Sequence, residues 1–382
     1  MSESPKPKSA KAGRILTRRA FVKTAGATGI ATGLVALSGM TRGPFAKAMT
    51  KMTVTLPWLP EGSYAWIYAA RAKGYWSERG IDGTIVRGYG SMAAAQGLFA
   101  GKFDAGVVSA GASILLSTKG VDLVSLDMSD YLPPMCVAVL ADSPIKVPKD
   151  LEGKTVAQTL SSVDAPYLSV FCKATGVDFS KIKTVNVDAK VRGTSLMEKR
   201  VDAITGIMSS ILPITEPAGK PTRYFVYRNY GVPLYGNTCV MVKPQLLDKD
   251  RGLCERLADG LMEGARYQLL EPEAARQTFL DAVPELKMSK TSAESARLAM
   301  AIQSYSMLAE PGVKEHGLGW TDYGRLQKMA ELTISSEAKG AKVPDVRKLF
   351  LNDFAGRLKL SATEWKTAEG GIGDIAKVFA KA

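Results

Sequence analysis

The 382-residue chain contains one histidine and four cysteines, and neither residue type stands in a metal or redox motif. The spacings of Cys136, Cys172, Cys239 and Cys254 match no zinc or CxxC pattern. His316 lies beside glycines in Glu-His-Gly-Leu-Gly, which is typical of a surface loop. The sequence therefore offers few residues for a catalytic zinc site or a Ser-His-Asp triad. We expect no metal, no cofactor and no catalytic residue.

A convincing membrane-spanning run is also lacking. The weakly apolar stretch over residues 25–40 is too short and too rich in glycine to span a bilayer. It follows a basic start with the pair Arg18 and Arg19, and it precedes Ala46-Lys47-Ala48, which has small residues at both positions before a cleavage point. This order predicts a twin-arginine signal over residues 1–48, cleaved after Ala48, which engages the twin-arginine translocase and leaves a folded protein in the periplasm.

Excess charge is small once this leader is set aside. Of the formal net charge of +13, the leader's nine basic residues and one acidic residue account for +8, which leaves about +5 on the other 334 residues. Nucleic acid is therefore not an expected partner. A chain of this length exceeds one compact core and predicts two lobes.

Three short apolar runs are present, and each leads into a loop of glycine, serine, proline or aromatic residues and then a helical pattern. They predict strands at 53–57, 84–88 and 105–109, with helices at about 64–73, 91–100 and 112–119. This alternation is typical of a parallel α/β sheet whose loops gather at the carboxyl edge, where small ligands bind.

A second alternating block begins at Leu151. It predicts strands at 183–187, 203–206 and 223–227, with helices near 163–175 and 193–199. Lys102–Val107 in the first block resembles Arg200–Thr205 in the second, because in each an Asp-Ala pair starts a short strand after a helix. This repeat favours two duplicated α/β lobes.

The remainder of the chain turns helical, at about 245–270, 273–282, 293–308 and 322–334. If Met135–Leu140 leaves the first lobe and Asn237–Val242 returns to it, lobe 1 covers residues 49–138, lobe 2 covers 139–235, and 236–382 return to lobe 1 with the C-terminal helices. Cys136 and Cys239 lie on these two crossovers and could be neighbours. We expect free thiols, because a protein folded before export matures in a reducing cytosol.

The loops after the strands supply the candidate binding residues. An aromatic residue directly after a buried strand either stacks on a flat ligand or closes the core. Glycine-rich loops before helices present N–H groups that favour carboxylate, sulfonate or phosphate. The candidates are Trp58, Pro60, Tyr64, Tyr89, Gly90, Ser91, Ser109, Ala110, Gly111, Ser161, Ser162, Asp164, Tyr167, Ile207, Met208, Tyr235 and Asn237. Trp58, Tyr64 and Tyr89 are the expected stacking surfaces. Arg192 and Glu216 are either charged contacts or solvated surface groups, and the second interpretation is preferred.

The order of Trp58–Pro60, Ala72–Trp76 with Gly80 and Ile81, and Gly101–Ala105 resembles periplasmic solute-binding proteins of ABC importers. The branch concerned takes up nitrate, sulfonates, taurine and thiamine-precursor pyrimidines. Leu151–Ala157 and Val201–Ala203 resemble the start of that family's second lobe and its internal strand, so the resemblance covers about residues 52–243. It implies a monomeric two-lobe Venus-flytrap fold that closes on a small molecule by hinge rotation and delivers it to a membrane permease.

A related fungal enzyme makes a pyrimidine from its own histidine and has a cysteine-rich active segment. This chain has no such cysteine cluster, and His316 lies late in the sequence, which favours a binding protein over an enzyme. An enzyme on the same scaffold and a ligand-sensing partner of a membrane receptor remain the alternatives. The ligand is expected to be a flat heterocycle such as a pyrimidine, or an organic anion such as a sulfonate or carboxylate.

Overall fold

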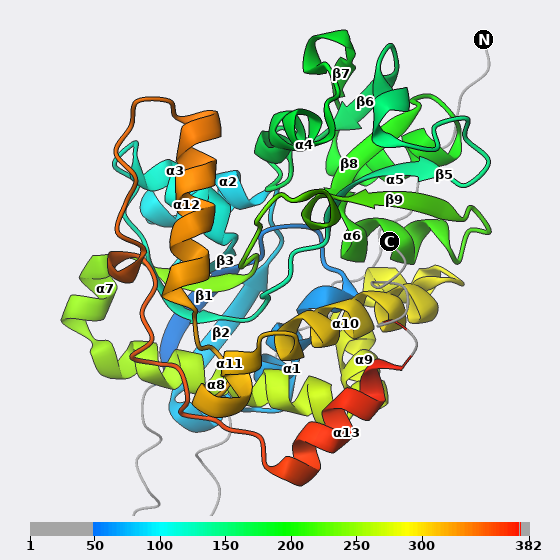
Figure 1. Cartoon of the computed structure of the whole chain (residues 1–382). Helices are drawn as coiled ribbons and strands as arrows, with labels where there is room; N and C mark the ends of the chain where they lie inside the picture. Colours follow the sequence, from blue (N-terminus) through cyan, green and yellow to red (C-terminus); the bar gives the residue numbers. More distant parts are fainter. Residues whose placement is uncertain (1–48, 374, 376–382) are drawn as a thin grey trace, which may run out of the picture. The chain divides into compact units, whose positions relative to one another are not determined.

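The computed structural model describes residues 49–373 and 375 (Figure 1). The predicted signal, with Arg18, Arg19 and the cleavage position after Ala48, lies outside the described residues. Within the described part of the chain, no helix combines the length and the apolar character needed to cross a bilayer.

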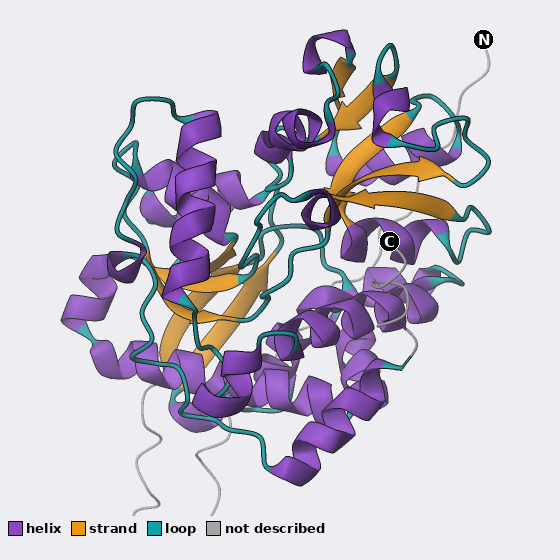
Figure 2. Ribbon diagram, in the orientation of Figure 1, coloured by secondary structure: helices purple, strands orange, loops and turns teal. Residues whose placement is uncertain are grey.

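The described strands form two separate five-stranded sheets (Figure 2). The first sheet has the order β2 (Ile81–Val86), β1 (Thr50–Thr55), β3 (Ala105–Val108), β10 (Cys239–Val242) and β4 (Val124–Met128). The second sheet has the order β7 (Lys183–Asn186), β6 (Thr155–Gln158), β8 (Ala203–Ile207), β5 (Met135–Leu140) and β9 (Thr222–Val226). In each sheet the first three strands are parallel and the fourth is antiparallel to both its neighbours. The predicted α/β class is confirmed.

The repeated Asp-Ala pair has the same structural role in both sheets. Asp104 precedes β3, and its carboxylate accepts a hydrogen bond from the Thr53 N–H at 2.7 Å. Asp202 precedes β8, and its carboxylate accepts from the Thr155 N–H at 2.8 Å. Each aspartate thus joins the start of one strand to its parallel neighbour, which explains why this short pattern occurs twice.

Six helices follow strands of the two sheets, and five of them lie close to predicted positions. They are α1 (Ala65–Ala72), α2 (Ser91–Phe99), α3 (Ala110–Ser117), α4 (Leu168–Thr175), α5 (Ala189–Met197) and α6 (Met208–Thr215). The sequence did not predict α6, because Pro213 lies inside it and proline usually ends a helix.

The C-terminal part is helical, as predicted, and packs against helices of both sheets (Figure 1). It comprises α7 (Pro244–Lys249), α8 (Arg251–Leu270), α9 (Pro272–Ala282), α10 (Ser292–Leu308), α11 (Pro311–His316), α12 (Tyr323–Glu337) and α13 (Ala362–Ile372). Helices α8 and α9 pack against α1, α12 packs against α3, and α10 packs against α6 of the second sheet. The single helix predicted over 245–270 is two, because Asp250 leaves the helical conformation and its carboxylate caps α8 through the Leu253 N–H.

The chain passes between the sheets twice, over residues 129–134 and 227–238. Met135–Leu140, expected as a crossover, is strand β5 and pairs with β8 and β9, so the predicted boundary at residue 138 falls inside a strand. Cys136 and Cys239 consequently lie in different sheets and are not neighbours across a crossover. The four cysteines are free and buried.

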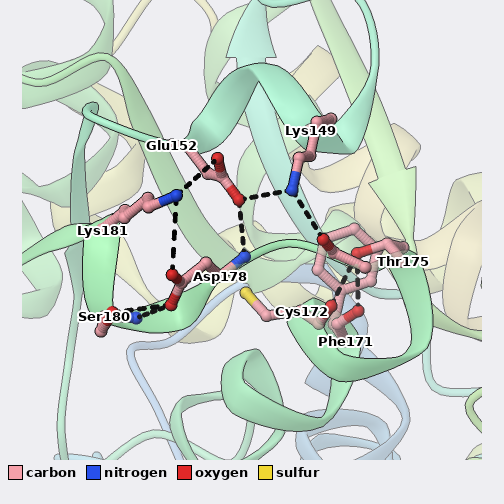
Figure 3. A network of polar contacts seen from close by, with 9 residues as sticks. Lys149, Glu152, Phe171, Cys172, Thr175, Asp178, Ser180 and Lys181 are labelled. Carbon is pink, nitrogen blue, oxygen red and sulfur yellow. Dashed lines mark hydrogen bonds and ion pairs between the residues drawn. The ribbon is translucent and has the colours of Figure 1, made fainter.

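An exposed polar network joins the loop before β6 to the segment before β7 (Figure 3). The Glu152 carboxylate accepts from Lys149 Nζ at 2.7 Å and from the Asp178 N–H at 2.7 Å, and it lies 3.7 Å from Lys181 Nζ. Solvent screens exposed ion pairs of this kind, so each contributes little to stability. The network therefore orders this edge of the second sheet but adds little to its stability.

Asp127, on the edge strand β4 of the first sheet, makes the protein's stability depend on pH. It is 2% exposed, its Oδ1 accepts from the Val240 N–H at 3.3 Å, and its Oδ2 has no partner among the described residues. Burial raises the pKa of Asp127 from 3.8 to about 7. Because the folded-state pKa exceeds the unfolded-state value, the folded protein takes up a proton that the unfolded chain does not. Stability therefore falls as pH rises from about 4 to about 7 and stays lower above that.

We expect Asp127→Asn to raise the free energy of unfolding by roughly 2–4 kcal/mol at pH 8, with the gain shrinking toward pH 4. Urea denaturation of both proteins at several pH values measures this difference. Asp142→Asn is the matched control, since Asp142 is exposed and paired with Lys199. A gain that does not vary with pH would contradict the assigned cause.

Candidate functional site

A pocket lies where loops of both sheets meet the second crossing segment. The space left inside it is small, about 20 Å³, which is room for one water molecule. The first sheet contributes the loop after β1 and the start of α2, and the second sheet contributes the loop after β6, helices α5 and α6 and the end of β8. The lining residues are Pro57, Trp58, Tyr64, Ser91, Ser162, Val163, Arg192, Ile207, Ser210, Asn237 and Thr238.

Arg192 on α5 faces Trp58 on the first sheet's side of the pocket. The guanidinium carbon lies 4.9 Å from the indole centroid, within the range of a cation–π contact. On its other side Arg192 Nη1 lies 3.8 Å from Asp164 Oδ1, and Asp164 also accepts a hydrogen bond from the Ser162 hydroxyl. Arg192 is 4% exposed and Asp164 is fully buried. The pocket wall thus contains a buried ion pair stacked on an aromatic ring.

Glu61 forms a polar contact between the same two parts of the chain. It lies in the loop after β1, and its Oε1 accepts from Ser63 Oγ at 2.9 Å and from Ser210 Oγ of α6 at 2.7 Å. Burial raises the pKa of Glu61 to about 7, although both hydroxyls and the charge of Arg192 act to lower it. The hydrogen bonds favour the ionised form of the carboxyl group, and burial favours the neutral form. Because the resulting pKa is about 7, Glu61 changes between the two forms near neutral pH.

A third contact between the sheets involves Ser161 and the loop before α2. Ser161 Oγ donates to the Tyr89 carbonyl at 2.5 Å, and the Met92 N–H donates to the Ser161 carbonyl at 3.4 Å. Gly90 lies at this contact with φ +115°, and a Cβ added there would meet the Ser161 carbonyl oxygen at 2.1 Å. The approach of the two loops therefore requires glycine at position 90.

The two crossing segments are joined by buried Asp130. Its Oδ2 accepts from Asn237 Nδ2 at 2.9 Å and from Thr238 Oγ1 at 3.3 Å, and its Oδ1 accepts from Ser306 of α10. Burial raises the pKa of Asp130, and these donors offset part of the rise. Asn237 and Thr238 line the pocket, so the hydrogen bonds of Asp130 hold two of the lining residues in position.

Six of the sequence-predicted residues line this pocket, from both sheets and the second crossing segment. They are Trp58, Tyr64, Ser91, Ser162, Ile207 and Asn237. Gly90 and Ser161 form the adjoining contact between the loops. Asp164 lies behind Arg192, and Met208 begins α6, where its N–H donates to the Pro134 carbonyl.

The other predicted residues lie outside the pocket lining. The Tyr89 ring is 62% exposed and stacks on the Arg87 guanidinium, so it offers no surface in this pocket. Pro60 is half-buried in its loop. The remaining five are Ser109, Ala110, Gly111, Tyr167 and Tyr235, all of them buried. The Tyr167 hydroxyl bonds Thr333, and that of Tyr235 accepts from the Asp322 N–H.

Sequence reasoning assigned no role in the site to Glu61, Ser210 or Thr238. Its preferred interpretation of Arg192, a solvated group, is wrong, and the alternative of a charged contact stays a prediction. Arg192 is a buried pocket residue, not a solvated one, whereas Glu216 is exposed as expected. Glu61 lies in the loop after β1, which the sequence had already indicated as a binding loop. An acidic residue between Pro60 and Gly62 was the feature that could have identified it. No such signal exists for Arg192, because its partners Asp164 and Trp58 are far away in sequence.

The described residues contain no group of three histidine, cysteine, aspartate or glutamate side chains that could hold a metal ion. His316 is exposed on α11, where its ring stacks on Trp320 at 4.5 Å between centroids. The pocket lining supplies hydroxyls, one amide, one guanidinium and aromatic rings. This arrangement can bind a small polar molecule through hydrogen bonds and stacking.

Comparison with known proteins identifies similar sequences and similar structures. The formylaminopyrimidine-binding protein of Halalkalibacterium halodurans is 24% identical over 235 residues, covering 61% of this chain and 71% of that protein. The alkanesulfonate-binding protein SsuA of Xanthomonas axonopodis pv. citri, bound to MOPS, has a TM-score of 0.61 at 12% identity, covering 78% of this chain and 97% of that one. The nitrate-binding protein NrtA of Synechocystis PCC 6803 has a TM-score of 0.60 at 12% identity, covering 86% and 90%.

At these identities the structural likeness shows the fold, which is that of periplasmic binding proteins, as the sequence predicted. The family model described as NMT1/THI5 like matches residues 62–275, from the start of η1 (Gly62–Tyr64) into α9. This match covers more than half of the sequence and includes the pocket-lining residues other than Pro57 and Trp58. The chain therefore belongs to the NMT1/THI5-like family.

Proposed function

We propose that this protein is the periplasmic solute-binding component of an ABC importer. It captures a small organic solute, a flat heterocycle or an organic anion, and delivers it to a membrane permease. The observation that carries this proposal is a single pocket lined by loops of both sheets and by the second crossing segment. The binding-protein relatives and the family support it.

Each sheet with its helices would be one lobe, and the lobes would close on the solute by a hinge at residues 129–134 and 227–238. These segments connect the sheets in sequence and lie close to the predicted boundaries at residues 138 and 235. The contacts of Glu61 with Ser210, Arg192 with Trp58 and Ser161 with Tyr89 would then belong to the closed state. Opening would break all three and admit the solute.

Export would use the twin-arginine route. The basic start, Arg18 and Arg19, the apolar stretch and the small residues before Ala48 support it, and β1 begins at Thr50, directly after the proposed cleavage point. Lysine at both arginine positions should then retain the precursor in the cytoplasm. Periplasmic recovery of that variant at the normal level would rule the route out.

A ligand screen tests the function. We expect a thermal-shift screen of nitrate, alkanesulfonates, carboxylates and pyrimidines to find a stabilising compound, and calorimetry to show saturable binding of one molecule per chain. The bound compound should be recovered unchanged by mass spectrometry. Turnover without saturable binding would favour the enzyme alternative instead.

His316→Gln separates these two outcomes. The residue is exposed on α11 and does not line the pocket, so a binding protein should retain its affinity after this change. An enzyme that consumes its own histidine would lose its reaction.

A further inference from the structure

Part of each crossing segment is fixed to the first sheet. Residues 129–131 and 236–238 continue the antiparallel pairing of β4 with β10 beyond the ends of these strands. The Ser129 N–H donates to the Thr238 carbonyl at 2.8 Å, and the Asn237 N–H donates to the Asp130 carbonyl at 2.8 Å. Backbone that is paired in this way moves with its sheet, so these residues cannot take up a rotation between the two sheets.

Helix α10 holds the first crossing segment a second time. Gln303 Nε2 donates to the Ser129 carbonyl at 2.9 Å. Ser306 Oγ donates to Asp130 Oδ1 and accepts from the Leu132 N–H at 2.9 Å. Gln303 is 3% exposed and Ser306 is 1% exposed, and buried polar groups are costly to leave without partners. The part of the segment that is fixed to the first sheet and its helices therefore extends to Leu132.

The part fixed to the second sheet begins only a few residues away in each segment. In the first segment, the Met208 N–H at the start of α6 donates to the Pro134 carbonyl at 3.0 Å. In the second segment, the Val232 N–H donates to the Tyr227 carbonyl at 3.3 Å, and the Tyr227 ring stacks on Phe171 of α4. The second segment is therefore held by the second sheet's helices as far as Val232.

The second segment returns to the first sheet's helices at Tyr235. Its N–H donates to Met329 Sδ of α12 at 3.2 Å, and its hydroxyl accepts from the Asp322 N–H at 2.9 Å. Each gap between the fixed parts contains a proline, Pro133 in the first segment and Pro233 in the second. Within the described part of the chain, no hydrogen bond holds either of these two prolines.

We propose that the two lobes turn about joints at Pro133 and Pro233, and that these prolines, with Ser306 of α10, are the positioning residues of the closing motion. A proline ring fixes φ near −65°, and the residue before a proline is confined to extended conformations. Each joint therefore has few soft dihedral angles, and the lobes move along a narrow path. This inference rests on the proposed function and narrows its hinge from two crossing segments to two short joints.

The distance between two spin labels reports on the joints without a ligand. The four native cysteines are buried, so labels attach selectively to Lys119→Cys after α3 of the first lobe and Lys173→Cys on α4 of the second. Both lysines are exposed. The width of the distance distribution measures how freely the lobes turn. A shift of its mean on adding a compound that the screen identifies tests lobe closure itself, so failure of the proposed function and failure of this inference give different results.

Pro133→Ala combined with Pro233→Ala is expected to widen the distance distribution roughly 1.5-fold or more, because alanine restores the backbone freedom that proline removes. Pro148→Ala combined with Pro244→Ala is the matched control, since these prolines begin η3 (Pro148–Leu151) of the second lobe and α7 of the first. The control should keep the width of the parent protein. Equal widths in the two double variants overturn the inference.

Ser306→Ala tests the role of α10. It removes the partner of the Leu132 N–H, so the first joint should lengthen and the distribution should widen roughly 1.5-fold or more. Ser304→Ala is the control, because Ser304 is also buried on α10 but its hydroxyl accepts from Gln268 of α8. Both variants should lose stability in urea, and only the first should change the width. Equal widths overturn the role of Ser306, and this comparison decides if the proline variant does not fold.

Discussion

Replacement of Gly90 by alanine is expected to weaken ligand binding at least 100-fold. A Cβ at this position would lie 2.1 Å from the Ser161 carbonyl oxygen and 2.5 Å from its carbon. Both atoms are backbone, so neither can move aside as a flexible side chain does. The loop before α2 and the loop after β6 would have to separate, and with them the two walls of the pocket. Calorimetry with the ligand from the screen measures the loss.

Alanine at position 90 would also strain the backbone, and a control must separate this strain from the steric clash with Ser161. Gly90 has φ +115° and ψ 148°, near a region open essentially to glycine alone, so alanine there also costs roughly 1–3 kcal/mol. Gly120→Ala is the control, because Gly120 also has positive φ, at +76°, but an added Cβ meets nothing within 4 Å. The control should lose some stability and keep its affinity. Affinity losses of similar size in both variants would refute the steric argument.

The sequence predicts the elements of this fold well because local patterns determine them. The Asp-Ala pairs before β3 and β8 are visible in the sequence, and both aspartates make the same backbone contact in the structure. The crossovers were harder to place. Met135–Leu140 is a buried strand that pairs with two others from distant parts of the chain, and no local feature distinguishes such a strand from a connection.

The sequence predicted which loops line the candidate site, but it did not predict the buried charged residues there. Trp58 and Ser162 follow strands, and that position alone predicts the carboxyl edge of a sheet. Arg192 lies within a helix of mixed polarity, where an arginine normally faces solvent. Its burial depends on Asp164 and Trp58, which the fold brings together from separate segments. Residues whose role depends on a distant partner therefore escape a single-sequence argument.

Gly264→Ala in α8 is expected to lower the free energy of unfolding by roughly 1–3 kcal/mol. An added Cβ would meet the Trp66 carbonyl oxygen at 2.2 Å and the Ala70 nitrogen at 3.0 Å, both in the backbone of α1. The two helices can accept it only by moving apart, which opens the well-packed contact between them. Because α1 directly follows Tyr64, a lining residue, ligand affinity should fall as well.

Gly370→Ala in α13 is the matched control for this prediction. Gly370 is also helical, but a Cβ there meets nothing within 4 Å, so the change should stabilise the protein by about 0.5–1 kcal/mol through helix propensity alone. Urea denaturation should therefore move the two midpoints in opposite directions. If Gly264→Ala also stabilised the protein, α1 and α8 could not pack as closely as the structure shows. Contacts other than those between α1 and α8 would then have to hold the pocket loop after β1 in place, since α1 is the helix that follows this loop.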